Sequence, residues 1–193
     1  MTDEELLTQA SRGDEAAFLA LYERHRDAVF RFAYRLLGSI ELAEDVAHDC
    51  FLSLIEQPQR FDSTRASLRT YLYGAARNLA MKHFRRTGQD VAVDDAAEEF
   101  LTTAEKQPLH QLLDEEVSQV VARAVALLPP LQREALVLFE YEELPLAEIA
   151  RVVAADVGTV KARLFRARRN LKKSLAGYFA DEPAALTLEE ACQ

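Results

Sequence analysis

The chain has 193 residues, of which 49% are hydrophobic and 28% charged, and a formal net charge of −9. This composition suits a globular protein of one medium or two small domains, and scarce Gly and Pro favour helix over sheet. No apolar run approaches the roughly 20 residues that cross a bilayer, and the acidic start MTDEELL is unlike a signal peptide. Cys50 and Cys192 form no metal-ligand spacing. We therefore expect a reduced, cytoplasmic protein without membrane insertion.

Two segments carry positive charge against this acidic background. Residues 60–88 hold seven basic residues and one acid, and residues 157–175 hold seven basic residues and no acid. The rest of the chain therefore carries −22. Because charges are screened beyond about 8 Å at physiological salt, a DNA phosphate would respond to the local segment more than to the net charge. The pattern predicts two contact sites for nucleic acid on a body that discourages unspecific binding.

The N-terminal half predicts three helices. Residues 14–37 repeat apolar side chains at three- and four-residue steps, and Gly38-Ser39 ends this helix and caps the next. The second helix, about 40–56, has acids in its first turns, which suits the helix dipole, and Pro58 stops it. A polar loop, QRFDSTRAS, leads to a third helix over about 68–86.

Residues 88–113 are acidic, weakly periodic and interrupted by Pro108, which predicts a flexible linker between domains at 1–87 and 114–176. The second domain shows helical patterns at 114–127 and about 131–141. The segment LPLAEIARVVAADVGTVKARLF then predicts helix, turn and helix, with Pro145 at the first start and Asp156 as N-cap of the last. Residues 177–193 are an acidic tail. We expect an all-α protein of two small helical domains joined by a flexible acidic linker.

The helix from Val157 has an apolar stripe and a basic face. Val160, Leu164, Ala167, Leu171 and Leu175 share one arc, while Lys161, Phe165, Arg166, Arg169 and Lys173 lie outside it. After a helix and a turn, such a face predicts a recognition helix for the DNA major groove. A solvated surface helix is the alternative.

The helix at 68–86 also interleaves aromatic and basic residues. Leu68, Leu72, Ala75 and Leu79 share a face, and Tyr73, Arg77 and Phe84 project near the opposite one, where bases of single-stranded nucleic acid could stack. The alternative is that Tyr73 and Phe84 are core residues.

The helix at 40–56 carries an acidic strip beside its apolar stripe. Glu44, Asp45, His48 and Asp49 form either a solvated face or a docking surface for a basic partner.

Together these segments resemble an extracytoplasmic-function (ECF) sigma factor of bacterial RNA polymerase, a compact group of the sigma-70 family. The two halves of its promoter-melting domain, region 2, resemble LYERHRDAVFRFAYRLLGSIELAEDVAHDCFLSLI and FDSTRASLRTYLYGAARNLAMKHFRR. Its helix-turn-helix domain, region 4, resembles LPPLQREALVLFEYEELPLAEIARVVAADVGTVKARLFRARRNLKKSL. The resemblance covers about residues 5–176 apart from the linker. It implies promoter-specific initiation with core polymerase, control by an anti-sigma factor, and no catalytic residue, metal, cofactor or small-molecule substrate.

The resemblance also assigns residues to each contact. Core polymerase would bind Glu44, Asp45, His48, Asp49 and Leu52. The −10 element would meet Arg60, Phe61, Asp62, Arg69, Tyr71, Tyr73, Arg77, Asn78, Lys82, Arg85 and Arg86. The −35 element would meet Thr159, Lys161, Ala162, Phe165, Arg166, Arg168, Arg169 and Lys173. The acidic linker would thread toward the RNA exit channel.

Five positions depart from the usual pattern of the family. Tyr71 stands where Trp is common, Gly74 where a basic or large residue is common, and His48 where Gln is common. Ala162 replaces a frequent Ser on the recognition helix. Ala154 replaces Gly in the helix-turn-helix turn, and because Ala is costlier in a left-handed conformation, the geometry of this turn is left open.

Three other functions are weaker interpretations of the sequence. An enzyme could use Asp94-Asp95 or Glu98-Glu99 as a metal site, but the histidines have no ligand spacing and no phosphate loop or nucleophile elbow is present. A stand-alone helix-turn-helix regulator would explain only the second domain. A sigma-mimicking adaptor would be expected to carry a phosphoreceiver domain, whose α/β pattern this sequence does not show.

Overall fold

The computed structural model describes residues 1–88 and 113–180, and within these ranges every element is a helix. The all-α expectation is therefore confirmed there. Residues 89–112, most of the expected linker, and residues 181–193 of the expected tail lie outside the described part. No helix in the described ranges is long and apolar enough to span a bilayer.

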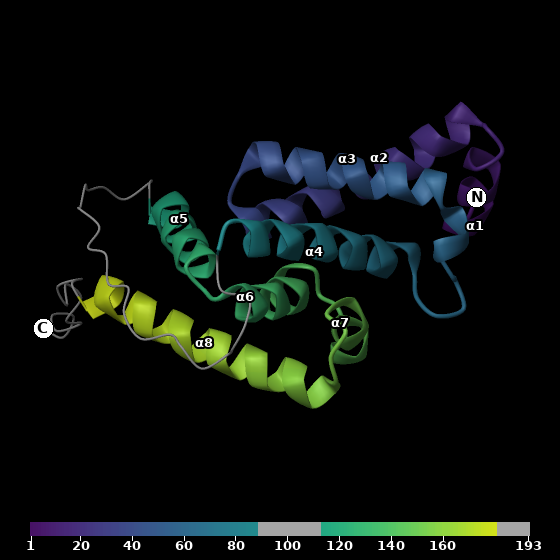
Figure 1. Cartoon of the computed structure of the whole chain (residues 1–193). Helices are drawn as coiled ribbons and strands as arrows, with labels where there is room; N and C mark the ends of the chain where they lie inside the picture. The colour runs from purple at the N-terminus through teal and green to yellow at the C-terminus, as the bar shows by residue number, and fades with distance from the viewer. Residues whose placement is uncertain (89–112, 181–193) are drawn as a thin grey trace, which may run out of the picture.

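The first group of helices is built around two long antiparallel neighbours. It comprises α1 (Asp3–Ala10), α2 (Glu15–Leu37), α3 (Ile40–Glu56), the short 3₁₀ turn η1 (Pro58–Arg60) and α4 (Leu68–Arg86). In Figure 1, α2 and α3 lie side by side and α4 runs beneath both. The three long helices match the predicted ranges closely. Gly38 ends α2 with φ 70°, and the Ser39 hydroxyl accepts from Leu42 N to start α3, as the sequence predicted.

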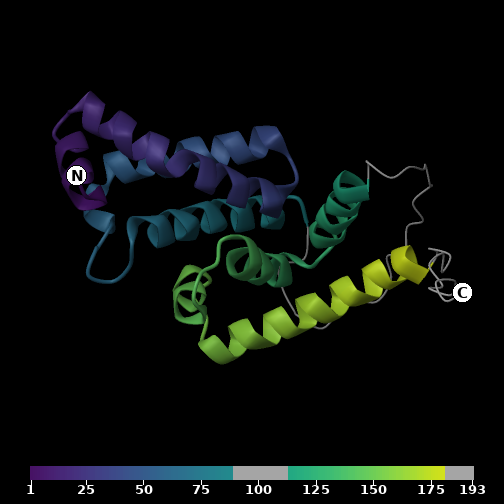
Figure 2. The ribbon, with the colours of Figure 1, turned by 180° about the vertical axis from the view of Figure 1, so that it is seen from behind.

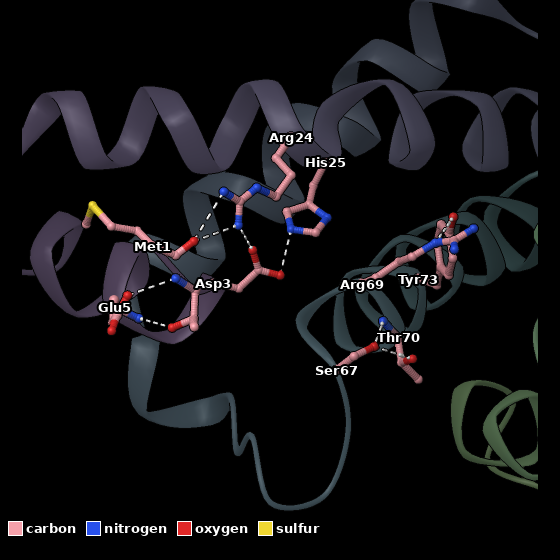
Figure 3. A network of polar contacts seen from close by, with 10 residues as sticks. Met1, Asp3, Glu5, Arg24, His25, Ser67, Arg69, Thr70 and Tyr73 are labelled. Carbon is pink, nitrogen blue, oxygen red and sulfur yellow. Dashed lines mark hydrogen bonds and ion pairs between the residues drawn. The ribbon is translucent and has the colours of Figure 1, made fainter.

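Helix α1 was not predicted from the sequence. It starts with a capping box in which Thr2 and Glu5 accept from each other's backbone N–H groups. Asp3 then joins it to α2, with one carboxylate oxygen 2.9 Å from His25 Nε2 and the other 2.6 Å from Arg24 Nη1 (Figure 3). These contacts explain why His25 interrupts the apolar stripe of α2 and is nevertheless buried.

The second group comprises α5 (Leu113–Ala126), α6 (Pro130–Leu136), η2 (Val137–Tyr141), α7 (Leu146–Val152) and α8 (Val157–Ala180). The predicted helix at 131–141 proves to be two segments, because the backbone widens into a π-helix at Val137 and Glu142 N donates to Val137 O. Helix α8 continues to Ala180, beyond the predicted end of the domain.

The two groups pack against each other, and α4 is the helix between them. Figures 1 and 2, from opposite sides, both show α6 and α7 between α4 and the long α8. Contacts also join α2 to α5, η2 and α6. Helix α4 is therefore covered on two sides, and its buried residues occupy more of its circumference than an amphipathic stripe would.

The turn between α7 and α8 keeps a left-handed residue although it has no glycine. Ala154 has φ 52°, and Ala155 N donates to Ala150 O to close the end of α7. Asp156 caps α8 as predicted, by accepting from Thr159 N at 2.9 Å. Ala154 thus adopts the left-handed conformation of this turn itself, at a conformational cost.

Ala154→Gly should stabilise the chain. A left-handed alanine costs roughly 1–2 kcal/mol, whereas glycine adds roughly 0.4–1 kcal/mol of unfolded-state entropy, so we expect a net gain of about 0.5–1 kcal/mol in the free energy of unfolding. Urea denaturation followed by circular dichroism measures this gain.

Ala20→Gly is the matched control, because Ala20 is exposed within α2. The same exchange there should cost about 0.5–1 kcal/mol. Destabilisation of similar size at both positions would contradict the strain assigned to Ala154.

Candidate nucleic-acid interface

Helix α8 presents the face that the sequence predicted for the major groove. Val160, Leu164 and Ala167 are buried, and Phe165 is 69% exposed on the opposite side. Lys161, Arg169 and Lys173 are also exposed, whereas Thr159, Ala162 and Arg166 are half-buried. The outward phenyl ring is available to contact a thymine methyl, and the cations beside it are available to bind phosphates.

Two arginines of α8 bind acids of the preceding helices. Arg168, predicted to contact DNA, donates to Glu140 Oε1 at 2.6 Å and lies over the Phe139 ring. Arg163, which the sequence reasoning did not single out, points inward and donates to Glu134 Oε1 at 3.0 Å. Arg163 therefore anchors α8 to α6 and faces away from the groove-reading side.

Most of the predicted −10 residues lie at the surface. Arg60, Asp62, Arg69, Asn78, Lys82, Arg85 and Arg86 are exposed. Phe61 and Tyr71 are half-buried and meet edge to face, with ring centroids 5.5 Å apart. Gly74 has open space where a Cβ would stand, so packing does not require the glycine.

The expectation that Tyr73 and Phe84 project from α4 is wrong, and the core alternative is correct. Tyr73 is 0% and Phe84 2% exposed, because the second group of helices covers this side of α4. The Tyr73 ring packs on Phe32, and its hydroxyl donates a short hydrogen bond to Glu142 Oε2. Burial, followed by the hydrogen bond to Glu142, raises the pKa of Tyr73 to about 12.

The same face of α4 carries two arginines that pair with acids from the second group. Arg69 donates to Glu142 Oε2 at 3.3 Å and to the Glu142 carbonyl at 3.0 Å. Its guanidinium lies over the Tyr73 ring, beside which Figure 3 shows it. Arg77 Nε donates to Glu134 Oε2 at 2.7 Å. Two predicted −10 contacts are thus occupied by carboxylates of the chain itself.

These carboxylates are buried, which makes their partners essential. Glu134 is 0% exposed; burial raises its pKa, and hydrogen bonding to Arg77 and the charges of Arg77 and Arg163 oppose the rise. Glu142 is 4% exposed and also accepts from Arg35 at 3.2 Å. Removing one partner of a buried pair leaves an uncompensated charge, which typically costs about 3–5 kcal/mol.

Further polar contacts join the same surfaces. The Thr70 hydroxyl donates to Glu148 of α7 at 2.6 Å, and Arg151 donates to the Arg65 carbonyl at 2.9 Å. Arg133 donates to the carbonyls of Leu36, Ala126 and Leu128, so it ties the end of α2 to the end of α5. Burial lowers the pKa of Arg133 to about 10.

The sequence reasoning missed Glu134 and Glu142 as functional candidates. Both acids lie in the largely apolar segment REALVLFEYEELP, which also contains Glu140 and Glu143. A carboxylate among apolar residues indicates a candidate buried acid that needs a basic partner, but this pattern does not separate Glu142 from the exposed Glu143. The partner itself, more than 50 residues away in the chain, carries no local signal.

The acidic strip of α3 is exposed along its whole length. Glu44, Asp45, His48 and Asp49 all face solvent, and Leu52, 48% exposed, continues the strip. Behind it Cys50 and Phe51 are buried in the core. No group of three or more His, Cys, Asp or Glu in the described residues is placed to hold a metal ion.

Comparisons with known proteins agree with this architecture. Residues 21–89 match the family model for sigma-70 region 2, and residues 118–171 match that for sigma-70 region 4. The ECF RNA polymerase sigma factor SigW of Bacillus subtilis is 32% identical over 88% of this chain and 94% of its own. The RNA polymerase sigma-H factor of Pseudomonas aeruginosa is 31% identical over 90% and 93%.

Two solved structures share the fold. CnrH, in complex with the cytosolic domain of CnrY, aligns with a TM-score of 0.65 at 24% identity over 94% of this chain and 99% of its own. The sigma factor RpoE of Bartonella quintana, in complex with the anti-sigma factor NepR, gives 0.61 at 24% identity over 82% and 96%. The chain is a two-domain helical DNA-binding protein of the region 2 and region 4 type. It belongs to the ECF group of sigma-70 family RNA polymerase sigma factors.

Cys50 should be inert to thiol reagents in the folded chain. Burial, and secondarily the charge of Asp49, raises its pKa from 9.0 to about 12, so the reactive thiolate is scarce at pH 8. In a Cys192→Ser chain, we expect no alkylation by iodoacetamide at pH 8 until urea unfolds the protein, as measured by mass spectrometry.

The same pKa predicts a pH window for stability. Because the folded-state pKa is raised, the contribution of the Cys50 thiol to the free energy of unfolding is complete below pH 9 and is lost as the pH rises toward about 12.

Rapid alkylation of Cys50 in the native chain at pH 8 would contradict the predicted inertness, because it would show that the core behind α3 opens readily.

Proposed function

We propose that this sigma factor binds core RNA polymerase through α3 and reads promoters with two separate surfaces. Residues 60–86 hold the −10 element and its melted strand, and α8 reads the −35 element. The observation that carries the proposal is the separation of surfaces: an exposed acidic strip ending in Leu52 on α3, and an exposed basic face around Phe165 on α8.

The acidic strip suits a basic protein partner more than DNA. Its carboxylates would repel phosphates, while an exposed leucine at its end supplies apolar contact area. Members of this family are initiation factors and not enzymes, so the chemistry of RNA synthesis belongs to the polymerase. Binding to polymerase would also offset repulsion between DNA and the acidic remainder of this chain.

The partners of the structural relatives suggest how the protein is controlled. RpoE of Bartonella quintana is bound to an anti-sigma factor, NepR, and CnrH to the cytosolic domain of CnrY. We extend this to an anti-sigma factor for the present chain, acting in the cytoplasm where the polymerase works.

Run-off transcription tests the function as a whole. Purified core polymerase with this protein should start RNA at defined sites on fragmented genomic DNA of the source organism. Those sites should share two upstream elements at constant spacing. If core polymerase gives no new start sites with this protein, while the protein alone binds duplex operators, the stand-alone regulator interpretation replaces the proposal.

Reversing two charges of the acidic strip should weaken polymerase binding. Asp45→Lys with Asp49→Lys places two cations one helical turn apart on the exposed side of α3, where the fold does not depend on them. We expect a loss of about tenfold or more in affinity for core polymerase, measured by a fluorescence titration.

Glu23→Lys with Asp27→Lys is the matched control. It makes the same charge change at the same spacing on an exposed part of α2. Equal loss in the two double variants would mean that net charge, and not the α3 strip, governs binding.

Removing the exposed ring of Phe165 or the half-buried cation of Arg166 should weaken −35 recognition. A direct base contact is worth roughly 1–3 kcal/mol, so Phe165→Ala or Arg166→Ala should lower affinity about 5- to 150-fold for the preferred −35 duplex and less for altered duplexes. Fluorescence anisotropy over a set of −35 variants measures this. Lys172→Ala, an exposed cation outside the predicted set, should lower all affinities alike; the same uniform loss at Phe165 would exclude base reading.

A further inference from the structure

The surface that reads the −35 element and the surface that reads the −10 element are not equally accessible. Phe165 and Lys161 on α8 are open to solvent. On α4, by contrast, Tyr73 is completely buried and the side chain of Arg77 is only 14% exposed. A nucleic acid strand can therefore reach α8 in this conformation, but not Tyr73 or Arg77 of α4. The side chain of Arg69 is 46% exposed, although its guanidinium already pairs with Glu142.

Two acids of the second group, Glu134 and Glu142, pair with arginines of α4 that were predicted to contact the −10 element. All three described side-chain partners of Glu142 belong to the first group of helices: Arg35 on α2, and Arg69 and Tyr73 on α4. Glu134 differs, because it contacts Arg163 of its own group as well as Arg77. If the groups separate, Glu134 keeps one cation and Glu142 keeps none of these partners.

The π-helical turn explains how Glu142 reaches these arginines. The widened turn at 137–141 ends with Glu142, and Glu143 follows with φ 53°. This backbone turns the Glu142 carboxylate inward between α2 and α4, while Glu143 remains exposed. Neighbouring acids of equal charge thus have different environments.

The contact is suited to opening. Beside the apolar core that the two groups share, it contains ion pairs and single hydrogen bonds, which water and phosphates can replace. Beside it lies a hollow of about 390 Å³ between α2 and α5, lined by Arg31, Tyr34, Arg35, Val121, Ala122 and Tyr141 among others. Arg35, whose guanidinium lies 4.5 Å from the centre of the Tyr141 ring, lines this open hollow.

We propose that Glu142, with Arg35, Arg69 and Tyr73, forms a carboxylate latch in the free chain. The latch masks the part of the −10 surface that carries Tyr73 and Arg77 and occupies Arg69, while it leaves the −35 surface open. Glu134 with Arg77 supports the latch. Promoter melting then requires the latch to open, so that the phosphates of the melted strand replace the carboxylates. This inference rests on the proposed function, because it assumes that α4 binds the −10 strand.

Two variants of opposite charge change test the latch. Glu142→Ala removes an anion and Arg35→Ala removes a cation that is not among the predicted DNA contacts. Both break the latch, so both should raise the affinity of the free chain for single-stranded DNA about fivefold or more. The probe is a fluorescein-labelled, mixed-sequence strand of about 12 nucleotides. A purely electrostatic effect would move the two variants in opposite directions.

The opening itself is measured without DNA. Spin labels at Ala16→Cys on α2 and Ser174→Cys on α8, both exposed, report the distance between the groups in a Cys192→Ser chain whose Cys50 is buried. We expect one narrow distance distribution for the parent and a broader, longer one for both variants. Circular dichroism checks that each variant keeps its helices, and Glu143→Ala is the charge-matched control for Glu142→Ala.

The outcomes separate the latch from the function. An unchanged distance in both folded variants overturns the latch and leaves the proposed function standing. A longer distance without a gain in strand affinity overturns the masking and also counts against the −10 role of α4. A gain that Arg69→Ala abolishes in the Glu142→Ala chain supports both.

Discussion

Buried carboxylates facing the arginines of α4 hold the two halves of this protein together. Glu134 and Glu142 are almost fully removed from water, where an unpaired charge would be prohibitively costly. The arginines that neutralise them come from α2, α4 and α8. These pairs act together with the apolar core that the two groups share to fix α4 between them.

In this one conformation, the surface proposed for the −35 element is exposed, whereas Tyr73 and Arg77 of the surface proposed for the −10 element are covered. Helix α8 turns its apolar stripe to α6 and α7 and its phenylalanine to solvent, so its reading face is complete without any rearrangement. Helix α4 has no such division of faces. Its arginines pair with acids of the same chain, and in our proposal the phosphates of a promoter strand replace these acids.

The sequence predicted local structure well where one residue type decides it. Gly38, Ser39 and Asp156 mark helix ends through φ preference and side-chain capping, and the stripe of α8 follows from its period. Helix α1 escaped prediction although Thr2 and Glu5 offer a capping box, because the helix has only eight residues and packs against α2 through distant contacts such as Asp3 with His25. Tyr73 and Phe84 were placed outside because a helical wheel shows one partner face, whereas α4 has two.

The exposure of the acidic strip and of Phe165 could be predicted, because each follows from one helix alone. The latch could not, since its pairs join residues more than 50 positions apart and depend on a π-helical turn. The acids at 134 and 142 did carry a weak signal, because they lie within a largely apolar segment. That signal indicates burial of the acid without identifying its partner.

The most direct test is to link the two groups covalently and to measure transcription initiation. Arg65 and Arg151 are exposed neighbours across the contact, joined by a hydrogen bond to the Arg65 carbonyl. An Arg65→Cys, Arg151→Cys, Cys192→Ser chain bridged by a short bismaleimide cannot separate its halves. We expect the bridged chain still to bind −35 duplex but to give no promoter-specific run-off RNA with core polymerase. The unbridged chain should give this RNA. Equal run-off synthesis by the bridged and unbridged chains would contradict this expectation.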